Sequence, residues 1–412
     1  MRITIFFIVL LGVMVFGAFE QEAYLFVQRL TSEDFETALS MCTDQVRKQL
    51  SLQNLSSIWN SLKSQLGGFK EIVAYEKTTQ GEYEIYIFTL RFEKEDISAL
   101  ITIDKEGKVA GLFFTQSAGA KYEPPDYANL ESFEEKDISV NGLPGKITIP
   151  EGKGPFPAVV LVHGSGPNDM DETIGPNKIF RDIAYGLSSN GILVLRYHKR
   201  TFVEKMDPTS LTVEEEVIKD ALEAVRILKQ REDVSRVYVL GHSLGAMLAP
   251  EIAERSKADG VIMIAPPARP LEDLMEDQLK YLQSLGLADN IEETLKILEK
   301  LRKKEFPPDE IVLGVSAKYF YDLRERQPVL TAKRLSVPML LIFGGRDYQV
   351  SEKDQEIWTK ELSDKENVKI VVFEDLNHLM MTGEGKSTPV EYMKKEHVDK
   401  RVIDAIVEWM VK

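Results

Sequence analysis

Apolar and polar residues alternate along the last two thirds of the chain in a pattern typical of buried strands separated by amphipathic helices. The strands are short runs of β-branched and aliphatic residues at 157–162, 192–197, 236–240, 261–265, 338–343 and 368–373. Helical stripes lie between them, over 177–189 and from Thr212, which forms a capping box with Glu215, to Leu228. This alternation predicts an α/β fold, a mostly parallel sheet covered by helices on both faces.

Residues 268–334 interrupt this alternation. They contain three amphipathic stripes and no predicted strand, and the stripes begin at Leu271, Ile291 and Val312. We expect this insertion to form a helical cap within a second domain that spans 131–412. The apolar faces of the cap would wall a pocket or pack the cap against itself.

A separate small α+β domain is predicted over residues 19–120. Ser32 is expected to cap a first helical pattern, and a second helix over 53–66 ends at Gly67. Turn signals at 80–81, 94–96 and 106–107 then separate alternating runs, which predicts an antiparallel sheet similar to cystatin-like or nuclear-transport-factor-like sheets. One strand face is expected to carry Tyr86, Phe88, Leu90 and Phe92. No chemistry is visible here, so packing, dimerisation and ligand binding all stay open as roles.

The segments that flank this small domain have distinct compositions. The first 18 residues have the form of a secretory signal, with Arg2, an apolar run over 3–16 and a small pair at 17–18. The apolar run is short for a membrane span, so we expect export to the periplasm or the medium, with an uncleaved membrane anchor as the alternative. Residues 121–130, which include two consecutive prolines, form the expected linker.

Composition and charge exclude several function classes. At 412 residues, of which 43% are hydrophobic, the chain can build two cores. The net charge of -15 argues against a nucleic-acid partner, because phosphates require a basic surface. A charged fraction of 28%, rich in Glu and Lys, is compatible with a thermophilic source.

Cysteine and histidine usage gives no indication of a disulfide or a metal site. The single cysteine, Cys42, cannot form an internal disulfide and is expected to be a buried small hydrophobe. No two of the five histidines have metal-ligand spacing, so we expect neither a metal nor a cofactor.

Candidate chemistry begins at the Gly-His-Ser-Leu-Gly segment 241–245, which follows a predicted strand and leads into a helical stretch. In this context a Gly-x-Ser-x-Gly pattern places its serine on a sharp strand-to-helix turn. Glycines are needed on both sides because a Cβ there would collide with neighbouring backbone. We therefore expect Ser243 to be a nucleophile at the N-terminus of a helix.

A nucleophilic serine needs a base, which in this arrangement follows it in the chain. Two histidines lie downstream, His378 and His397. His378 sits in a turn directly after the predicted strand at 368–373, whereas His397 begins an amphipathic segment where a histidine is usually only solvated. We therefore expect His378 to be the base.

The acid that orients this base is expected to be Asp347. It follows the buried strand at 338–343 through Gly344-Gly345-Arg346, which places its carboxylate at the carboxyl end of a strand. Glu272 and Asp273, beyond the strand at 261–265, are the alternatives. Asp375 is too close in sequence to His378 to be favoured.

A second glycine turn follows the strand at 157–162, and its N–H groups can complete an oxyanion hole. The expected donors are the N–H groups of Ser165, Gly166 and Leu244, the residue after the nucleophile. His163 and His242 are expected to anchor or pack this region rather than to act as bases. We expect the pair at 199–200, which follows a strand end, to be a solvated loop.

Residues from about 130 to the end resemble an α/β-hydrolase. The His-Gly-Ser-Gly loop at 163–166, the Gly-His-Ser-Leu-Gly turn at 241–245, Asp347 and His378 appear in the order found in that family. The whole chain resembles the EstD-type bacterial carboxylesterases. The resemblance implies a catalytic triad of Ser243, Asp347 and His378, a small-molecule ester as the substrate, and an acyl-enzyme intermediate. The alternatives are a peptidase or amidase of the same fold, and a non-catalytic binding protein whose working part is the leading domain. An oligomer formed through that domain is also compatible with the sequence.

Overall fold

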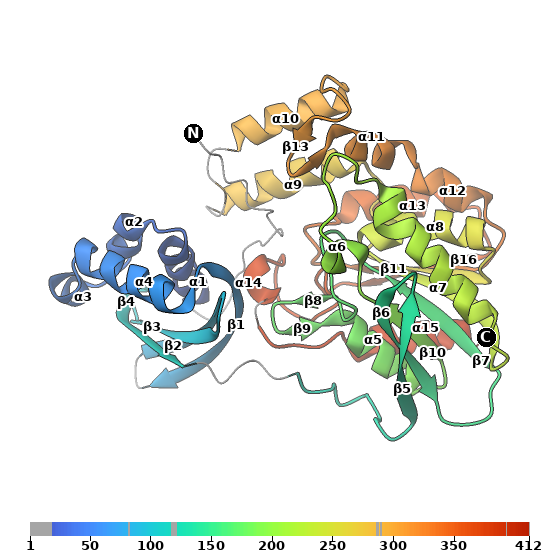
Figure 1. Ribbon diagram of the computed structural model, residues 1–412, viewed down its shortest axis with the longest axis horizontal. Coiled ribbons are helices and arrows are strands. Elements are labelled where there is room, and N and C mark those ends of the chain that lie inside the picture. Colours follow the sequence, from blue (N-terminus) through green and yellow to red (C-terminus); the bar gives the residue numbers. More distant parts are fainter. Residues whose placement is uncertain are drawn as a thin grey trace.

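The computed structural model describes residues 19–80, 83–116, 122–285, 288, 291–392 and 394–411. The signal segment predicted at 1–18 lies outside the described residues. The described part of the chain forms a four-stranded sheet near the N-terminus and an eight-stranded sheet after it (Figure 1). In the described ranges, no helix combines the length and the apolar character needed to cross a membrane.

The leading domain packs four helices against an antiparallel sheet, which confirms the predicted α+β class. The helices are α1 (Glu20–Thr31), α2 (Phe35–Ser40), α3 (Asp44–Gln49) and α4 (Leu52–Leu66). The strands, in spatial order, are β1 (Phe69–Gln80), β2 (Tyr83–Phe92), β3 (Asp96–Ile103) and β4 (Val109–Gln116). The four predicted inward side chains of β2 are all buried, and Trp59 of α4 packs against Phe92. Cys42 is buried as expected.

The prediction for Ser32 is wrong. The N–H of Ser32 donates to carbonyls of α1, so this residue closes α1 at its C-terminus. The next helix is capped by Asp34 instead, whose Oδ1 accepts the N–H of Thr37 at 3.2 Å. Both residues are good N-caps by type, and the sequence pattern did not separate α1 from the short helix that follows it.

The second domain is built on a sheet with the strand order β16-β15-β12-β11-β7-β10-β6-β5. Its first six strands in that order run parallel, and β6 and β5 extend the edge in antiparallel fashion. The strands are β5 (Phe133–Val140), β6 (Leu143–Pro150), β7 (Phe156–Val162), β10 (Leu193–Tyr197), β11 (Val234–His242), β12 (Gly260–Ile264), β15 (Met339–Gly344) and β16 (Val368–Phe373). A separate small hairpin pairs β8 (Thr173–Ile174) with β9 (Asn177–Lys178).

Helices cover both faces of this sheet, which confirms the predicted α/β architecture (Figure 1). One face packs against α5 (Ile179–Ser188) and α15 (Lys400–Met410). The other packs against α7 (Lys219–Lys229), α8 (Leu244–Ser256) and α13 (Glu352–Glu361). Two short helices, α6 (Arg200–Val203) and α14 (Pro389–Tyr392), lie in loops. Of the predicted capping box, the structure has the bond from the N–H of Glu215 to Thr212 Oγ1 at 3.2 Å, and a π-helical turn, Glu214–Ile218, then continues into α7.

The inserted region is a helical cap, as predicted, but it contains two short strands that the sequence pattern missed. Its helices are α9 (Leu271–Ser284), α10 (Glu292–Arg302), α11 (Ala317–Glu325) and α12 (Pro328–Arg334). Strands β13 (Ile311–Val312) and β14 (Val315–Ser316) form a hairpin through Leu313 and Gly314, which both have positive φ. Two-residue strands are too short to show a period-two pattern, so Val312 and Val315 were read as part of a helical stripe.

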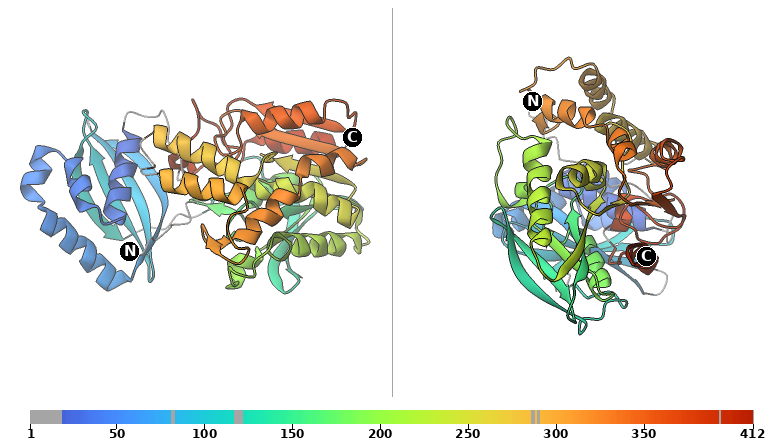
Figure 2. Two further views of the ribbon diagram at one scale, coloured as in Figure 1. Left: turned by 90° about the horizontal axis from the view of Figure 1, so that it is seen from above. Right: turned by 90° about the vertical axis from the view of Figure 1, so that its right-hand side faces the viewer.

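The two domains meet at α14. A parallel bridge pairs Tyr75 of β1 with Lys394, just beyond α14, and the buried Tyr75 hydroxyl donates to Glu20 of α1. The described part of the linker also lies against the second domain, because Tyr122 Oη donates to Asp182 Oδ1 and Tyr127 Oη donates to the carbonyl of Val398. Figure 2 shows the leading domain beside the cap and the large sheet.

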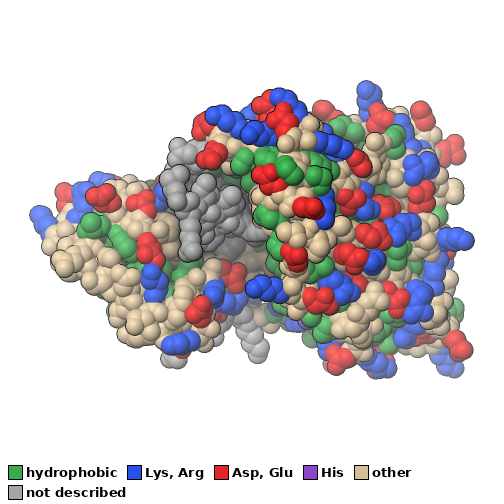
Figure 3. All heavy atoms as spheres, turned by 45° about the horizontal axis from the view of Figure 1, so that its top comes forward, with side chains coloured by type: hydrophobic (Ala, Val, Ile, Leu, Met, Phe, Trp, Pro, Cys, Tyr) green, Lys and Arg blue, Asp and Glu red, His purple; other side chains and the backbone are tan. Residues whose placement is uncertain are grey.

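The surface carries both signs of charge. On the face shown in Figure 3, acidic and basic side chains of the described residues are interspersed over the cap and the second domain. Among the described residues, several charged side chains form ion pairs at helical spacing, for example Lys280 with Glu276 and Lys303 with Glu299. On the face in view, the field is therefore locally balanced, although the whole chain is acidic.

Candidate active site

Ser243 stands on the sharp turn between β11 and α8. Its backbone has φ 52° and ψ -117°, a strained conformation for a residue with a side chain. Two main-chain hydrogen bonds hold Ser243 in this conformation. Its N–H donates to the carbonyl of Ile264 at 3.0 Å, and its carbonyl accepts the N–H of Met247 at 2.9 Å. The predicted strand-to-helix elbow is therefore present, with the side chain at the first turn of a helix.

No side chain fits at the two glycines that flank Ser243, Gly241 and Gly245. A Cβ on Gly241 would lie 2.2 Å from the carbonyl carbon and oxygen of Gly245, and a Cβ on Gly245 would lie 2.0 Å from the carbonyl oxygen of Val162. Real Cβ atoms essentially never approach backbone so closely. The Gly-x-Ser-x-Gly spacing thus lets α8 start directly against the end of β7.

His378 and Asp347 form a buried pair. His378 Nδ1 and Asp347 Oδ2 are 2.6 Å apart, and both side chains are almost completely shielded from solvent. The other carboxylate oxygen, Oδ1, accepts the N–H groups of Gln349 and Val350 at 2.7 and 3.0 Å. Asp347 is therefore fixed as an acceptor, which selects the tautomer of His378 with the proton on Nδ1 and leaves Nε2 available.

The two loops that carry this pair can approach because of glycine. β15 ends at Gly344, where a Cβ would lie 2.4 Å from the carbonyl oxygen of Leu376 in the His378 loop. A second brace comes from α14, where Glu391 Oε2 accepts from Arg346 at 3.1 Å and from Asn377 at 2.9 Å. Each of these donors directly precedes a member of the Asp347–His378 pair. Glu391 is buried, and its burial raises its pKa despite the bonds from Arg346 and Asn377.

The elbow and the His378 loop are joined through His242. The ring centroids of His242 and His378 are 4.8 Å apart, and His242 Nε2 lies 3.0 Å from the carbonyl oxygen of His378. This contact brings Ser243, the next residue, beside the Asp347–His378 pair. In the described part of the chain, no hydrogen bond joins Ser243 Oγ to His378 itself; such bonds often tighten only when substrate is bound.

The alternative acids and bases are engaged elsewhere. Glu272 accepts from Arg324 and Asp273 from Arg302, both within the cap. Asp375 accepts from Arg401. His397 precedes α15 and bonds to Asp182 Oδ2 at 3.0 Å, so the expectation that it is merely solvated is wrong.

The turn after β7 is held by side chains that leave the N–H groups of Ser165 and Gly166 without an acceptor among the described contacts. Lys199 Nζ donates to the carbonyl of Gly164 at 2.9 Å, and Asn168 Nδ2 donates to the carbonyls of Gly164 and Ser165. Among the described contacts, no acceptor is bonded to the N–H of Ser165, Gly166 or Leu244. These are the three predicted oxyanion donors.

His163 behaves as the predicted structural anchor of this turn. Its Nε2 lies 3.0 Å from the carbonyl of Asp169, and its ring packs on Phe180 and Tyr197. Burial lowers its pKa to about 4, so it stays neutral near pH 7.

Three buried charged residues of this region were missed or misread. Lys199 was expected in a solvated loop, but it is buried and pairs with Glu216 at 2.7 Å. Glu216 in turn accepts from Tyr319 of α11, so this chain of contacts connects the turn after β7 to the cap. Glu172 contacts both His242 and the N–H of Gly164.

The sequence carried little signal for these residues. Glu172 lies seventy positions before His242, in a polar stretch without periodicity. Only the position of Lys199, directly after a predicted strand end, could have marked it for closer attention.

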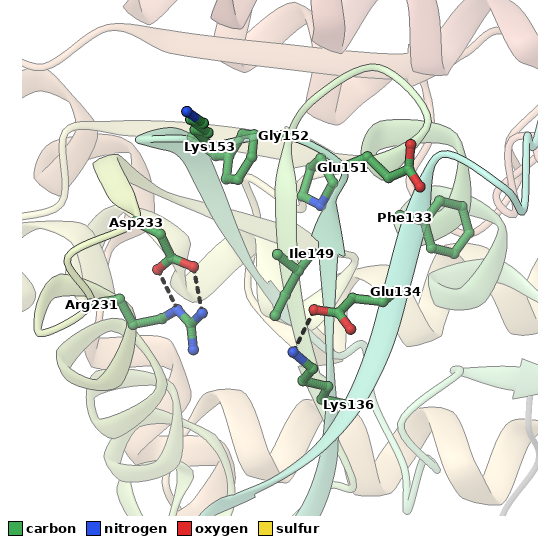
Figure 4. A pocket seen from close by; sticks show the side chains of 11 residues that line it. Phe133, Glu134, Lys136, Ile149, Glu151, Gly152, Lys153, Arg231 and Asp233 are labelled. Carbon is green, nitrogen blue, oxygen red and sulfur yellow. Dashed lines mark hydrogen bonds and ion pairs between the residues drawn. The ribbon is translucent and has the colours of Figure 1, made fainter.

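A hollow of about 400 Å³ lies elsewhere on the molecule, between β5, β6 and the segment before β7 (Figure 4). Arg231 pairs with Asp233 there, and Lys136 pairs with Glu134. Phe156, which begins β7, places the hollow at the amino ends of the parallel strands, opposite the edge where Ser243, Asp347 and His378 gather. Because α/β sheets bind ligands at the carboxyl edge, this hollow is not the substrate site.

Two family models match the chain. Residues 155–385 match the family described as serine aminopeptidase, S33, and residues 23–112 match a family of unknown function, DUF3887. Esterase EstD from Thermotoga maritima is 78% identical over 412 residues, which is 100% of both chains.

Solved structures with low sequence identity also match. Est1E from Butyrivibrio proteoclasticus has a TM-score of 0.44 at 19% identity, over 67% of this chain and 97% of that chain. An acylaminoacyl peptidase from Pyrococcus horikoshii has a TM-score of 0.45 at 17% identity, over 83% of this chain and 51% of that chain.

The S33 match spans more than half of the chain, and the identity with EstD extends over its full length. Together with the eight-stranded sheet and its cap, these matches confirm the predicted fold and the resemblance stated from the motifs. The chain therefore belongs to the α/β-hydrolase family of the serine aminopeptidase S33 type, and within it to the EstD-type esterases.

Proposed function

We propose that this protein hydrolyses short-chain carboxylic esters through an acyl-enzyme formed on Ser243. The observation that carries the proposal is the buried 2.6 Å contact between His378 and Asp347, placed beside a strained elbow that presents a serine at a helix start. The 78% identity with an esterase over the full length of the chain supports an ester as the substrate class.

The proposed reaction proceeds in two halves. Ser243 Oγ attacks the ester carbonyl carbon while its proton passes to Nε2 of His378. Asp347 holds the ring and balances the charge of the imidazolium. The bond to the alcohol oxygen then breaks, and His378 returns the proton to the leaving oxygen. Water, deprotonated by His378, attacks the acyl-enzyme, and the acid and free Ser243 are released.

The negative charge of each tetrahedral intermediate needs preorganised donors. We assign this role to the N–H of Leu244 at the start of α8 together with those of Ser165 and Gly166. Fixed donors of this kind each contribute about 2.7–4 kcal/mol in related chemistry, because they need no reorganisation as charge develops.

We further propose that helix α9 limits the length of the acyl group. It lies over the loop that follows Asp347, where Gln278 donates to the carbonyl of Gln349 at 2.8 Å and Tyr281 packs on Tyr348 with ring centroids 5.2 Å apart. Leu274, on the same helix, is buried. We expect Leu274→Ala to change KM for longer esters more than for acetate, since each buried methylene contributes about 0.8 kcal/mol. An equal loss at all chain lengths would instead assign Leu274 to packing.

The main alternative is a peptidase or amidase, which the description of the S33 family favours. The two classes differ at the leaving group, because an amine must be protonated as the intermediate collapses whereas an alcohol leaves more easily. We expect nitrophenyl esters of butyrate or shorter acids to be favoured, with anilides cut at least roughly a hundredfold more slowly in kcat/KM.

The experiment is a turnover panel of nitrophenyl esters of graded acyl length beside aminoacyl and dipeptidyl anilides, with Ser243→Ala as the blank. Anilides turned over as fast as esters would replace the esterase proposal with the peptidase one. Activity that survives in Ser243→Ala would reject the acyl-enzyme.

We also propose that residues 1–18 direct export, as their signal-like composition indicates. Intact-mass measurement of the protein from cell fractions distinguishes the outcomes. Loss of the segment in an exported fraction supports a cleaved signal, a full-length membrane fraction supports an anchor, and a full-length cytosolic protein rejects export.

A further inference from the structure

Both ring nitrogens of His242 face acceptors. Nδ1 lies 3.1 Å from Glu172 Oε2, and Nε2 lies 3.0 Å from the carbonyl oxygen of His378. A neutral imidazole has only one N–H, whereas the imidazolium has two. The carbonyl oxygen of His378 can only accept, and Glu172 Oε2 accepts while the carboxylate is ionised, so both contacts are hydrogen bonds at the same time when His242 is doubly protonated.

Glu172 makes a second contact that is equally specific. Its Oε1 accepts the N–H of Gly164 at 2.5 Å, and its side chain is almost fully buried. The site is tightly packed, because a Cβ on Gly164 would lie 2.9 Å from Glu172 Oε1 and 3.3 Å from the Cβ of Ser243. One carboxylate therefore joins the turn after β7 to the elbow.

We propose that Glu172 and an imidazolium at His242 form an ion pair that positions the turn after β7 and the His378 loop on either side of Ser243. Neither residue touches the reacting atoms. The pair sets the distance between the N–H groups of Ser165 and Gly166 and the carbonyl that Ser243 attacks. This inference rests on the proposed acyl transfer at Ser243.

Titratable groups from several adjoining elements surround the pair. Asp347 and the His378 ring face it from the loops after β15 and β16, His163 lies beside it on the turn after β7, and Lys199 approaches Gly164 from the end of β10.

The carboxylates decide the charge state of His242. Burial opposes the charged form of His242, but the carboxylates of Glu172 and Asp347 outweigh it and raise its pKa. Burial likewise opposes the charged form of Glu172, but His242 and the N–H of Gly164 hold its pKa below the usual value.

The sign of the pH effect follows from this. Below the raised pKa of His242, both of its N–H bonds are present. As the pH rises through that pKa the ring loses one proton, and either Glu172 or the His378 carbonyl loses its donor. Activity should therefore fall on the alkaline side, and the position of this fall should depend on the charge of Glu172.

The test is Glu172→Gln, which keeps the shape of the side chain and removes its charge. We expect kcat to fall about ten- to a hundredfold with KM changed less than about threefold, because misplaced donors weaken the transition state more than the ground state. The alkaline limb of the kcat profile should move to lower pH. Rates are normalised to the fraction of enzyme that reacts with a fluorophosphonate.

Asp220→Asn is the matched control. Asp220 is buried and pairs with Arg200 at 2.7 Å, away from Ser243. A purely structural role of Glu172 would resemble this control, with lower thermal stability and an unmoved alkaline limb per active site. That result would overturn the inference.

A measurement on the unmodified protein covers the case in which Glu172→Gln does not fold. Nitrogen NMR with labelled histidine should show both ring nitrogens of His242 carrying protons at pH 7.5, assigned with His242→Gln. A single protonated nitrogen would overturn the inference. Fluorophosphonate labelling of the wild type at Ser243 tests the proposed function separately, so the two failures are distinguishable.

Discussion

Gly245→Ala tests the elbow with a single methyl group. The new Cβ would lie 2.0 Å from the carbonyl oxygen of Val162, and neither atom belongs to a flexible side chain. To reach even a tight contact of 3.0 Å, the end of β7 and the start of α8 must separate by about 1 Å. The turn that carries the proposed oxyanion donors Ser165 and Gly166 begins directly after Val162, so this displacement moves the donors away from Ser243.

A misplacement of about 1 Å in a catalytic constellation costs on the order of a hundredfold in rate. We therefore expect Gly245→Ala to lower kcat on nitrophenyl butyrate at least about a hundredfold, with a smaller change in KM. The rate of fluorophosphonate labelling should fall in parallel. Thermal unfolding monitored by circular dichroism should show a folded protein of reduced stability, since overpacking typically costs about 1–3 kcal/mol.

Gly191→Ala is the control for this experiment. Gly191 has φ +81°, so alanine is strained there, but no atom lies within 4 Å of its Cβ position. This variant should lose about 1–2 kcal/mol of stability and keep its kcat. If Gly245→Ala retains wild-type kcat, the close approach of α8 to β7 does not set the catalytic geometry, and the reasoning is refuted.

Three further substitutions test the buried charges. Lys199→Met removes the cation from the buried Glu216 and should cost about 3–5 kcal/mol in chemical denaturation, whereas the double variant with Glu216→Gln should recover much of this. Equal losses in the single and double variants would contradict the pairing. Asp347→Asn should keep the fold but lower kcat about a thousandfold or more, because the amide no longer selects the Nδ1–H tautomer of His378. Wild-type turnover by this variant would give the acid role to another carboxylate.

Local signals in the sequence predicted the elbow and the strand ends well. The turn at Ser243 depends on five consecutive residues where a strand passes into a helix, so the pattern contains nearly all of its determinants. Asp347 and His378 each follow a buried strand, and adjacent parallel strands bring their loops to one edge of the sheet. Chain order and topology were therefore enough to anticipate that the two residues meet.

Contacts that depend on long-range packing were not predictable in this way. The burial of Lys199 is decided by Glu216 and by the carbonyl of Gly164, neither of which is near it in sequence. Glu172 was missed for the same reason, since its residue type and surroundings suggest a surface loop. Short elements were also missed, because β13 and β14 and the helices α2 and α3 that follow Ser32 are too brief for a period to emerge.

The central claim is that Ser243 forms a covalent acyl intermediate with His378 as its base. The most direct measurement is intact-protein mass spectrometry after reaction with a fluorophosphonate, followed by peptide mapping, on the wild type, Ser243→Ala and His378→Ala. We expect one adduct on the wild type, mapped to Ser243, no adduct on Ser243→Ala, and labelling at least about a thousandfold slower on His378→Ala. Labelling of Ser243→Ala at the wild-type rate, or an adduct mapped to another residue, would contradict the account.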